Sequence, residues 1–386
     1  MLFRLLGFVL IVGLTSASLQ DVKNDIKSGK KPMHGVNLGG WLVAEHWMTQ
    51  GSPAWIGVPD DVANGGEYQT MKYLGHDKGD GQFNEHRRTF ITESDFQEIG
   101  SYGLNTVRIP IGYWIVGFDN TGGGDANGWK VWAPGALDYL DMAIREWGPK
   151  HNVLVFISIH AAKGSQNGND HSSPENPGHA YWSTYPENVV NTLDVVEFLT
   201  KRYKDEVAFL GIGLLNEPVG QDENVLKQYY YDAYGRVRNN QGSDCLLSTS
   251  PMLNEQSPGM GGWDNFMPAG QFYNIRHEWH KYLVWGFEES NGWTAEKVID
   301  YANNGMANDF NNWHGNWIFV GEWALATSVS MNDDQMKRLS TAELNTFGKA
   351  VGGWTYWAWK QYGDDGSGKN GWSAKQMFRQ GFLPHF

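Results

Sequence analysis

Short apolar segments recur along nearly the whole chain, and segments with helical periodicity separate them. This alternation predicts a parallel sheet, because neighbouring parallel strands need a long crossover connection that is usually a helix. Eight strands are the number that closes a (β/α)8 barrel, and we therefore predict an α/β fold with a single (β/α)8 TIM barrel. The predicted strands are residues 35–37, 106–109, 153–159, 209–215, 245–249, 272–275, 317–320 and 353–356.

An open, doubly wound sheet is the alternative architecture for this pattern. That fold often carries a Gly-x-Gly-x-x-Gly run after its first strand, and none follows the first predicted strand here. The length of 386 residues also suits one barrel. We expect residues 20–31 to be a polar leader, and the predicted helices are residues 93–102, 136–147, 187–204, 224–238, 295–311 and 334–350.

The N-terminus has the pattern of a secretory signal. Arg4 precedes the apolar run 5–14, and the small residues 15–18 follow it. Ten apolar residues fall short of the roughly 20 that a membrane span needs, so a cleaved signal of residues 1–18 is favoured over an uncleaved anchor. We expect residues 19–386 to form one secreted domain with no membrane attachment. Cys245 is the single cysteine, so no internal disulfide can form, and we expect it to be buried.

Charge and aromatic content indicate the class of partner. The chain has 30 Lys and Arg against 43 Asp and Glu, a net charge of −13. Such a balance argues against nucleic acid as a partner. The chain also contains 19 Trp, 17 Tyr, 18 Phe and 48 Gly. Aromatic ring faces and glycine-rich loops suit ligands with apolar C–H faces and hydroxylated edges, and sugars have this form.

Polar residues end several of the predicted strands. A (β/α)8 barrel brings the carboxyl ends of its strands to one face, which is where barrel enzymes carry their active sites. We therefore expect the polar strand ends to meet in one site. These residues are Arg108, His160, Asn216, Glu217, His280 and Glu322.

Glu217 and Glu322 are the residues of this set that predict a reaction. A pair of carboxylates can cleave a glycosidic bond, because one protonates the leaving oxygen while the other attacks the sugar or activates water. A salt bridge at the barrel rim is the alternative for either glutamate. Their neighbours are Trp, Gly and Asn rather than Lys or Arg, which favours the catalytic interpretation.

Other catalytic chemistries lack their motifs in this sequence. His160, His277 and His280 show no His-Glu-x-x-His or Cys/His spacing, so we predict no metal site. No glycine cluster is followed by the Lys-Ser/Thr of a phosphate loop, and we predict no cofactor. Residues 164–168 (GSQNG) are not the Gly-x-Ser-x-Gly elbow of a serine hydrolase.

Longer motifs from about residue 34 to residue 384 carry a resemblance to a known family. The chain resembles the secreted exo-1,3-β-glucanase branch of glycoside hydrolase family 5, in clan A of the cellulase superfamily, found in fungi and oomycetes. The opening motif together with GSQNG is the more specific part, whereas Asn-Glu-Pro is shared widely in the clan. The motifs are residues 35–45 (GVNLGGWLVAE), 105–110 (NTVRIP), 164–168 (GSQNG), 214–218 (LLNEP), 320–323 (VGEW) and 353–360 (GWTYWAWK).

The resemblance implies a role for each strand-end residue. Glu217 would be the general acid/base and Glu322 the nucleophile. Asn216 would bind the 2-hydroxyl of the sugar, where contacts strengthen in the transition state. Arg108 would lie beneath Glu322 and keep it ionised, and His160 would line the −1 sugar site.

Further residues match the family outside these strand ends. His280 and Tyr282 match its His-x-Tyr element, and Trp357 would stack under the −1 sugar, with packing in the barrel core as the alternative. Glu45 and Asp170 match acidic residues that hold the terminal glucose and make cleavage exo-acting. These five residues would surround the catalytic pair.

Two positions depart from the family pattern. Trp285 matches one half of an aromatic entrance to the +1 site, but Asn169 stands where the other aromatic is common. The run 276–282 (RHEWHKY) also differs from the usual Asp-x-His-His-Tyr wording, so His277 could replace His280 in the alignment. Both departures concern linkage preference rather than the two-glutamate chemistry.

The resemblance implies a monomeric, extracellular or cell-wall enzyme that acts on a β-glucan polysaccharide or oligosaccharide. It would release glucose from the non-reducing end of β-1,3-glucan with retention, through a covalent glycosyl-enzyme that also permits transglycosylation. A β-1,6-glucanase, a β-glucosidase or a cellulase are alternatives of the same fold. A non-catalytic glucan-binding wall protein or elicitor is the alternative from another class.

Overall fold

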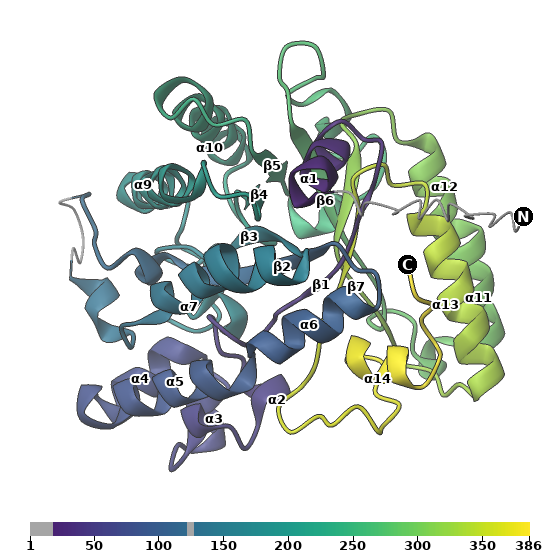
Figure 1. Cartoon of the computed structure of the whole chain (residues 1–386), viewed down its shortest axis with the longest axis horizontal. Helices are drawn as coiled ribbons and strands as arrows, with labels where there is room; N and C mark the ends of the chain where they lie inside the picture. The colour runs from purple at the N-terminus through teal and green to yellow at the C-terminus, as the bar shows by residue number, and fades with distance from the viewer. Residues whose placement is uncertain (1–17, 122–126) are drawn as a thin grey trace, which may run out of the picture.

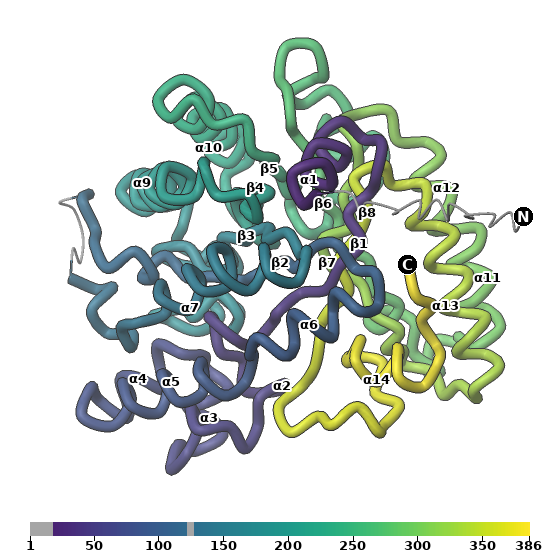
Figure 2. Tube along the Cα trace, viewed as in Figure 1, coloured from purple at the N-terminus to yellow at the C-terminus, as the bar shows by residue number. Residues whose placement is uncertain are grey.

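Eight parallel strands close into a barrel in chain order, and β8 pairs with β1 to complete it (Figures 1 and 2). The computed structural model describes residues 18–121 and 127–386. The prediction of a (β/α)8 barrel is confirmed. The strands are β1 (Met33–Asn37), β2 (Thr106–Gly112), β3 (Leu154–Ala161), β4 (Phe209–Gly213), β5 (Leu246–Thr249), β6 (Ile275–Leu283), β7 (Ile318–Thr327) and β8 (Gly353–Tyr356).

Seven of the eight predicted strands coincide with observed ones, and β6 is the exception. The predicted strand 272–275 ends where β6 begins. The error has a physical cause, because β6 carries Arg276, His277, Glu278 and His280, all of them buried. A strand that points charged side chains into the barrel does not look apolar in the sequence.

Helices cover the outside of the barrel, as Figure 1 shows. The predicted helix 136–147 contains a π-helical turn at Ala143–Trp147, and the predicted helix 295–311 is interrupted at Asn304. The segment between β1 and β2 holds four helices that the sequence did not predict, because they are short or glycine-containing. The α-helices are α1 (Leu19–Lys27), α2 (His46–Thr49), α3 (Asp60–Ala63), α4 (Glu67–Leu74), α5 (His76–Phe90), α6 (Glu93–Ser101), α7 (Ala136–Met142), α8 (Gly148–His151), α9 (Pro186–Tyr203), α10 (Glu223–Gly235), α11 (Ala295–Asn303), α12 (Gly305–Asn312), α13 (Asp333–Phe347) and α14 (Ala374–Arg379).

The prediction of a polar leader at residues 20–31 is wrong, because α1 occupies most of it. Ser18 caps this helix by accepting a hydrogen bond from the backbone N–H of Asp21 at 3.2 Å. Leu19 and Ile26 are buried in a cluster with the first residues of several strands. The helix therefore packs across the amino-terminal end of the barrel, opposite the end where polar strand ends meet.

Three other predictions concern the signal, membrane attachment and Cys245. The predicted signal, residues 1–18, lies outside the described residues except for Ser18. In the part of the chain that the structure describes, no helix is long and apolar enough to cross a membrane. Cys245 is buried as expected, and burial raises the pKa of its thiol.

The helices between β1 and β2 brace the segment that enters the site. Glu67 in α4 accepts a hydrogen bond from the backbone N–H of Ala44 at 3.1 Å and another from Arg87 in α5 at 3.0 Å. The Trp41 indole donates to the carbonyl of Arg87 at 2.8 Å. Glu67 and Arg87 are each about 1% exposed, so this ion pair is fully buried and fixes the backbone next to Glu45.

Candidate active site

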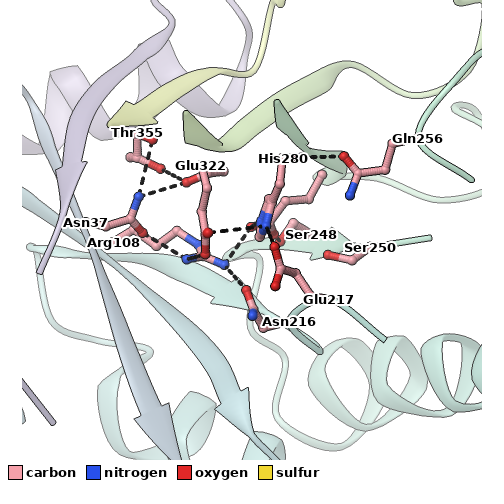
Figure 3. A network of polar contacts seen from close by, with 12 residues as sticks. Asn37, Arg108, Asn216, Glu217, Ser248, Ser250, Gln256, His280, Glu322 and Thr355 are labelled. Carbon is pink, nitrogen blue, oxygen red and sulfur yellow. Dashed lines mark hydrogen bonds and ion pairs between the residues drawn. The ribbon is translucent and has the colours of Figure 1, made fainter. Parts of the chain in front are cut away.

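Glu217 and Glu322 meet at the carboxyl end of the barrel (Figure 3). Glu322 belongs to β7, and Glu217 follows β4 in a left-handed backbone conformation with φ 46°. One carboxylate oxygen of each, together with a ring nitrogen of His280, lie within 4.8 Å of one another. The two predicted carboxylates thus lie close enough together for both to reach the same bond of a ligand held between them.

The GSQNG loop holds the backbone around Glu217. The Gln166 side chain donates to the carbonyls of His160 at 2.7 Å and Asn216 at 2.9 Å, so it joins the ends of β3 and β4. Asn167 donates to the carbonyl of Glu217 at 3.2 Å. These bonds stabilise a backbone conformation that is unfavourable for a residue other than glycine.

Arg108 lies at the centre of the polar network in Figure 3 and is fully buried. One terminal nitrogen of its guanidinium donates to Glu322 at 3.0 Å and to Asn37 at 2.8 Å. The other contacts Asn216 at 2.8 Å and Glu278 at 2.9 Å. Arg108 therefore lies directly against Glu322, as the resemblance implies, and it also orients Asn216.

His280 lies between the two carboxylates. Its Nδ1 is 2.7 Å from Glu217 and 3.5 Å from Glu322, and its Nε2 is 3.3 Å from Glu278. Tyr282 donates its hydroxyl to Glu322 at 2.8 Å. Burial opposes the charged form of His280, but the charge of Glu322 and the bonds to Glu217 and Glu278 outweigh burial and raise its pKa to about 10.

His277 does not take this position. Its ring stacks on Trp313 with centroids 4.5 Å apart, away from the catalytic pair. Burial lowers the pKa of His277 to about 3, so it is a neutral packing group. The structure therefore selects His280 from the two histidines that the sequence left open.

Glu217 and Glu322 lose their protons as a pair, because two carboxylates this close repel each other when both are charged. Burial raises the pKa of Glu322, and the charge of Glu217 adds to this effect. Burial also opposes ionisation of Glu217, but the hydrogen bond and charge of His280 lower its pKa to about 2. The surroundings of the resting site therefore favour ionisation of Glu217 over ionisation of Glu322.

A cavity of about 640 Å³ opens above the pair and is lined by most of the predicted site residues. His160 and Trp357 are buried side by side, with ring centroids 5.4 Å apart and planes within 6°. Gly39 lies against Trp357, and a Cβ there would meet its ring at 2.8 Å. Both rings line the cavity, and Trp357 also packs in a small hydrophobic cluster with Met48 and Ala358.

Glu45 and Asp170 lie together in the same cavity. Trp47 donates its indole N–H to one oxygen of Glu45 at 2.9 Å, while the other oxygen is buried without a hydrogen-bond partner. Burial and the charge of Asp170 raise the pKa of Glu45 well above its usual range. Glu45 is thus positioned to accept or donate a hydrogen bond to a bound polar ligand.

Tryptophans gather at the mouth of the cavity. Trp285 is 67% exposed, and its ring lies 6.0 Å from Trp372, which lies 5.5 Å from Trp47. Asn169 also lines the cavity and contributes a polar side chain beside these tryptophans. The entrance therefore combines three indole rings with one amide.

Several residues of this site were missed in the sequence. Asn37 ends β1 as the other polar residues end their strands, so the same signal predicts it. Glu278 lies two residues before His280 on the same face of β6, a signal that required the strand to be recognised. His171, with Nε2 3.7 Å from Glu217, and the entrance residues Trp47 and Trp372 carried no distinguishing pattern.

Glu217, His280 and Glu322 are also close enough together to hold a metal ion. The guanidinium of Arg108, 3.0 Å from Glu322, already supplies a fixed positive charge at this point. A divalent cation would be repelled by it and by the imidazolium of His280. The donor set therefore fits a metal poorly.

A closed (β/α)8 barrel with two facing glutamates in a polar, aromatic-walled cavity defines a class of protein, the glycoside hydrolases. Comparison with known proteins agrees. Residues 64–363 match the family model described as cellulase (glycosyl hydrolase family 5). The chain belongs to this family.

Named relatives and solved structures extend the comparison. The chain is 31% identical over 375 residues to the glucan 1,3-beta-glucosidase of Schwanniomyces occidentalis, covering 85% of this chain and 83% of that one. It is 31% identical over 396 residues to the probable glucan 1,3-beta-glucosidase A of Emericella nidulans, covering 91% and 90%. The crystal structure of rutinosidase from Aspergillus niger has the same fold, with a TM-score of 0.74 and 19% identity over 92% of this chain and 99% of that one.

Proposed function

We propose that this protein is a retaining exo-acting glycoside hydrolase that releases glucose from the non-reducing end of β-1,3-glucan. The observation that carries the proposal is the pair of carboxylate oxygens of Glu217 and Glu322 within 4.8 Å of each other. Retaining enzymes place their two carboxyl groups about 5–5.5 Å apart, whereas inverting enzymes need about 6.5–9.5 Å for a water molecule. The names of the relatives support the choice of substrate.

In this mechanism Glu322 attacks the anomeric carbon and Glu217 protonates the leaving oxygen. Glu322 must be ionised for the attack and Glu217 must be protonated, which is the reverse of the order favoured in the resting site, so a proton has to pass to Glu217. His280 supplies the route, because its Nδ1 faces both carboxylates, at 2.7 Å and 3.5 Å. Arg108 and Tyr282 then stabilise the charged Glu322.

Hydrolysis of the glycosyl-enzyme completes the cycle. Glu217, now ionised, activates water on the face that the leaving group has vacated. A sugar hydroxyl can take the place of water, and transglycosylation results. Asn216 has an amide nitrogen that is buried without a partner, which suits a hydrogen bond to the 2-hydroxyl of the bound sugar.

Glu45 and Asp170 support exo cleavage. They lie in the cavity with Trp357 and His160, so a terminal glucose on the Trp357 ring would present its hydroxyls to both acids. The chain of the glucan would then leave past Trp285, Trp372 and Asn169. We propose that the chain acts as a single, monomeric, secreted catalytic domain once its N-terminal signal, predicted as residues 1–18, has been removed.

Glucose release tests the proposal. The purified protein is incubated with β-1,3-glucan, β-1,6-glucan, cellulose and an aryl β-glucoside, and the products are followed by proton NMR from the first minutes. We expect glucose from β-1,3-glucan, first as the β-anomer. Initial α-glucose would exclude retention, a larger oligosaccharide as first product would exclude exo cleavage, and binding without any release would indicate a glucan-binding protein.

A further inference from the structure

A third carboxylate, Glu278, lies beneath the catalytic pair and takes no part in the steps above. It is 2% exposed and belongs to β6. Its Oε1 is 2.9 Å from Arg108 and 3.3 Å from Nε2 of His280. Ser248, from β5, donates its hydroxyl to the other oxygen. Glu278 thus contacts both cations that touch the catalytic glutamates.

The barrel makes room for this side chain with two glycines. A Cβ on Gly321, in β7, would lie 2.1 Å from Oε1 of Glu278. A Cβ on Gly213, in β4, would lie 3.2 Å from its Oε2. The strands on either side of the site therefore leave a space that is filled by the carboxylate of Glu278.

The contacts of His280 require a particular charge state. Both ring nitrogens face carboxylates, Nδ1 toward Glu217 and Nε2 toward Glu278. A neutral imidazole has a single N–H and can satisfy only one of them, whereas an imidazolium donates to both. Glu278 thus favours the cation from the side of the ring that is turned away from the substrate cavity.

We propose that Glu278 is a positioning residue that holds Arg108 against Glu322 and keeps on His280 the proton that it passes to Glu217, so that one buried carboxylate prepares both catalytic ones. This inference rests on the proposed function for its effect on turnover. The charged and titratable groups around His280 are Glu217, Glu278, Glu322 and His160, and those around Glu278 are Arg108, His277, His280 and Tyr230. Burial opposes ionisation of Glu278, yet Arg108 and His280 lower its pKa to about 2, so it carries its charge throughout the working pH range.

The substitution Glu278→Gln tests this role, because it removes the charge and keeps the shape and an acceptor oxygen. We expect kcat on an aryl β-glucoside to fall about 10- to 100-fold, with KM changed less than about threefold, because the catalytic groups lose their alignment. The alkaline limb of the pH profile should move to lower pH. In the resting enzyme, the NMR titration of His280 should move down by roughly one pH unit or more.

Glu343→Gln controls for the exchange of a buried carboxyl group for an amide, since Glu343 is also buried but lies in α13, away from the catalytic contacts, and it should leave kcat and the His280 titration unchanged. Glu278→Asp keeps the charge and should keep the wild-type position of the pH profile and of the His280 titration, even if kcat falls. If Glu278→Gln does not fold, a displaced His280 titration or pH profile in Glu278→Asp would still overturn the proposal. An unchanged His280 titration and pH profile in Glu278→Gln, or the same displacement in both Glu278 variants, would overturn the proposal.

The histidine titration is read without substrate. If the wild-type protein hydrolyses no glucoside, the proposed function is wrong. A downward shift of the His280 titration in Glu278→Gln would still establish the electrostatic contact. An active wild type with an unresponsive His280 would remove only the role of Glu278. The two failures are therefore distinguishable.

Discussion

Glu217 and Glu322 carry the same carboxyl group, and the side chains around them differ. Glu322 accepts hydrogen bonds from Arg108 and Tyr282, which fix it under the cavity. Glu217 contacts the imidazole of His280, a group that can exchange a proton with it. The environment of Glu322 suits a nucleophile that must be held in a fixed orientation, and the environment of Glu217 suits an acid that must be reprotonated.

Azide rescue separates the two roles. We expect Glu322→Gln to lose at least about 10³-fold in kcat with every substrate, because an amide cannot form the glycosyl-enzyme. Glu217→Ala should still react with a substrate whose leaving group needs no protonation and then stall. Added azide should restore its turnover and give β-glucosyl azide, identified by NMR. An α-azide from Glu217→Ala, together with a β-azide from Glu322→Ala, would reverse the assignments.

Asn169 is the residue at which substrate preference should respond. Asn169→Phe places a ring at the entrance that already contains Trp285 and Trp372. A second stacking surface worth about 0.5–1.5 kcal/mol should lower KM for a β-1,3-linked oligosaccharide by about two- to tenfold. KM for a simple alkyl β-glucoside serves as the control and should change little. Equal changes for both substrates would show that Asn169 does not contact the second sugar.

The helices α4 and α5 act as a unit through their buried ion pair. Glu67→Gln leaves Arg87 charged, buried and without its partner, so the free energy of unfolding should fall by about 3–5 kcal/mol in a urea titration. At urea concentrations below the unfolding transition, the activity should also be lower than that of the wild type, because Glu67 anchors the backbone that leads to Glu45. The control is Glu85→Gln on the exposed face of α5, whose loss of contact with Arg88 should change stability little.

Helix α13 contains a carboxyl group that should be stable only in its neutral form. Glu343 is fully buried, neither oxygen has a hydrogen-bond partner, and burial raises its pKa well above the ordinary value. A pKa raised by folding gives stability that is complete below the unfolded pKa and is lost as pH rises toward the folded one. Glu343→Gln should therefore raise Tm relative to wild type more at pH 8 than at pH 5. A constant difference across this range would show that Glu343 does not titrate.

Strands were the predictable elements of this chain, and the reason is their burial. Parallel barrel strands are covered on both faces, so they appear as apolar runs, and a polar residue at the end of a run marks the catalytic face. β6 escaped because its inward side chains belong to the site itself. The short helices between β1 and β2 escaped because tertiary contacts such as that of Glu67 with Arg87, rather than helical periodicity, stabilise them.

At the scale of the whole molecule, the two ends of the barrel have separate tasks. The carboxyl end holds the cavity, and the amino end is covered by α1, which Arg276 contacts through the carbonyl of Ile26 at 3.0 Å. The sequence predicted the first end, since resemblance and strand ends agree there. The sequence did not predict the amino end. The apolar face of α1 can be recognised only once it is known that the helix covers the first residues of the strands.

The capped start of α1 bears on where the mature polypeptide begins. Removal of residues 1–18 would take Ser18 away and with it the cap of α1, at a cost of about 1 kcal/mol. Processing one residue earlier, between Ala17 and Ser18, would retain the cap. Mass spectrometry of the secreted protein should find Ser18 as its first residue, and a version starting at Leu19 should melt at a lower temperature. On the proposed secretory route, cleavage at two bonds one residue apart would therefore give mature proteins of different stability.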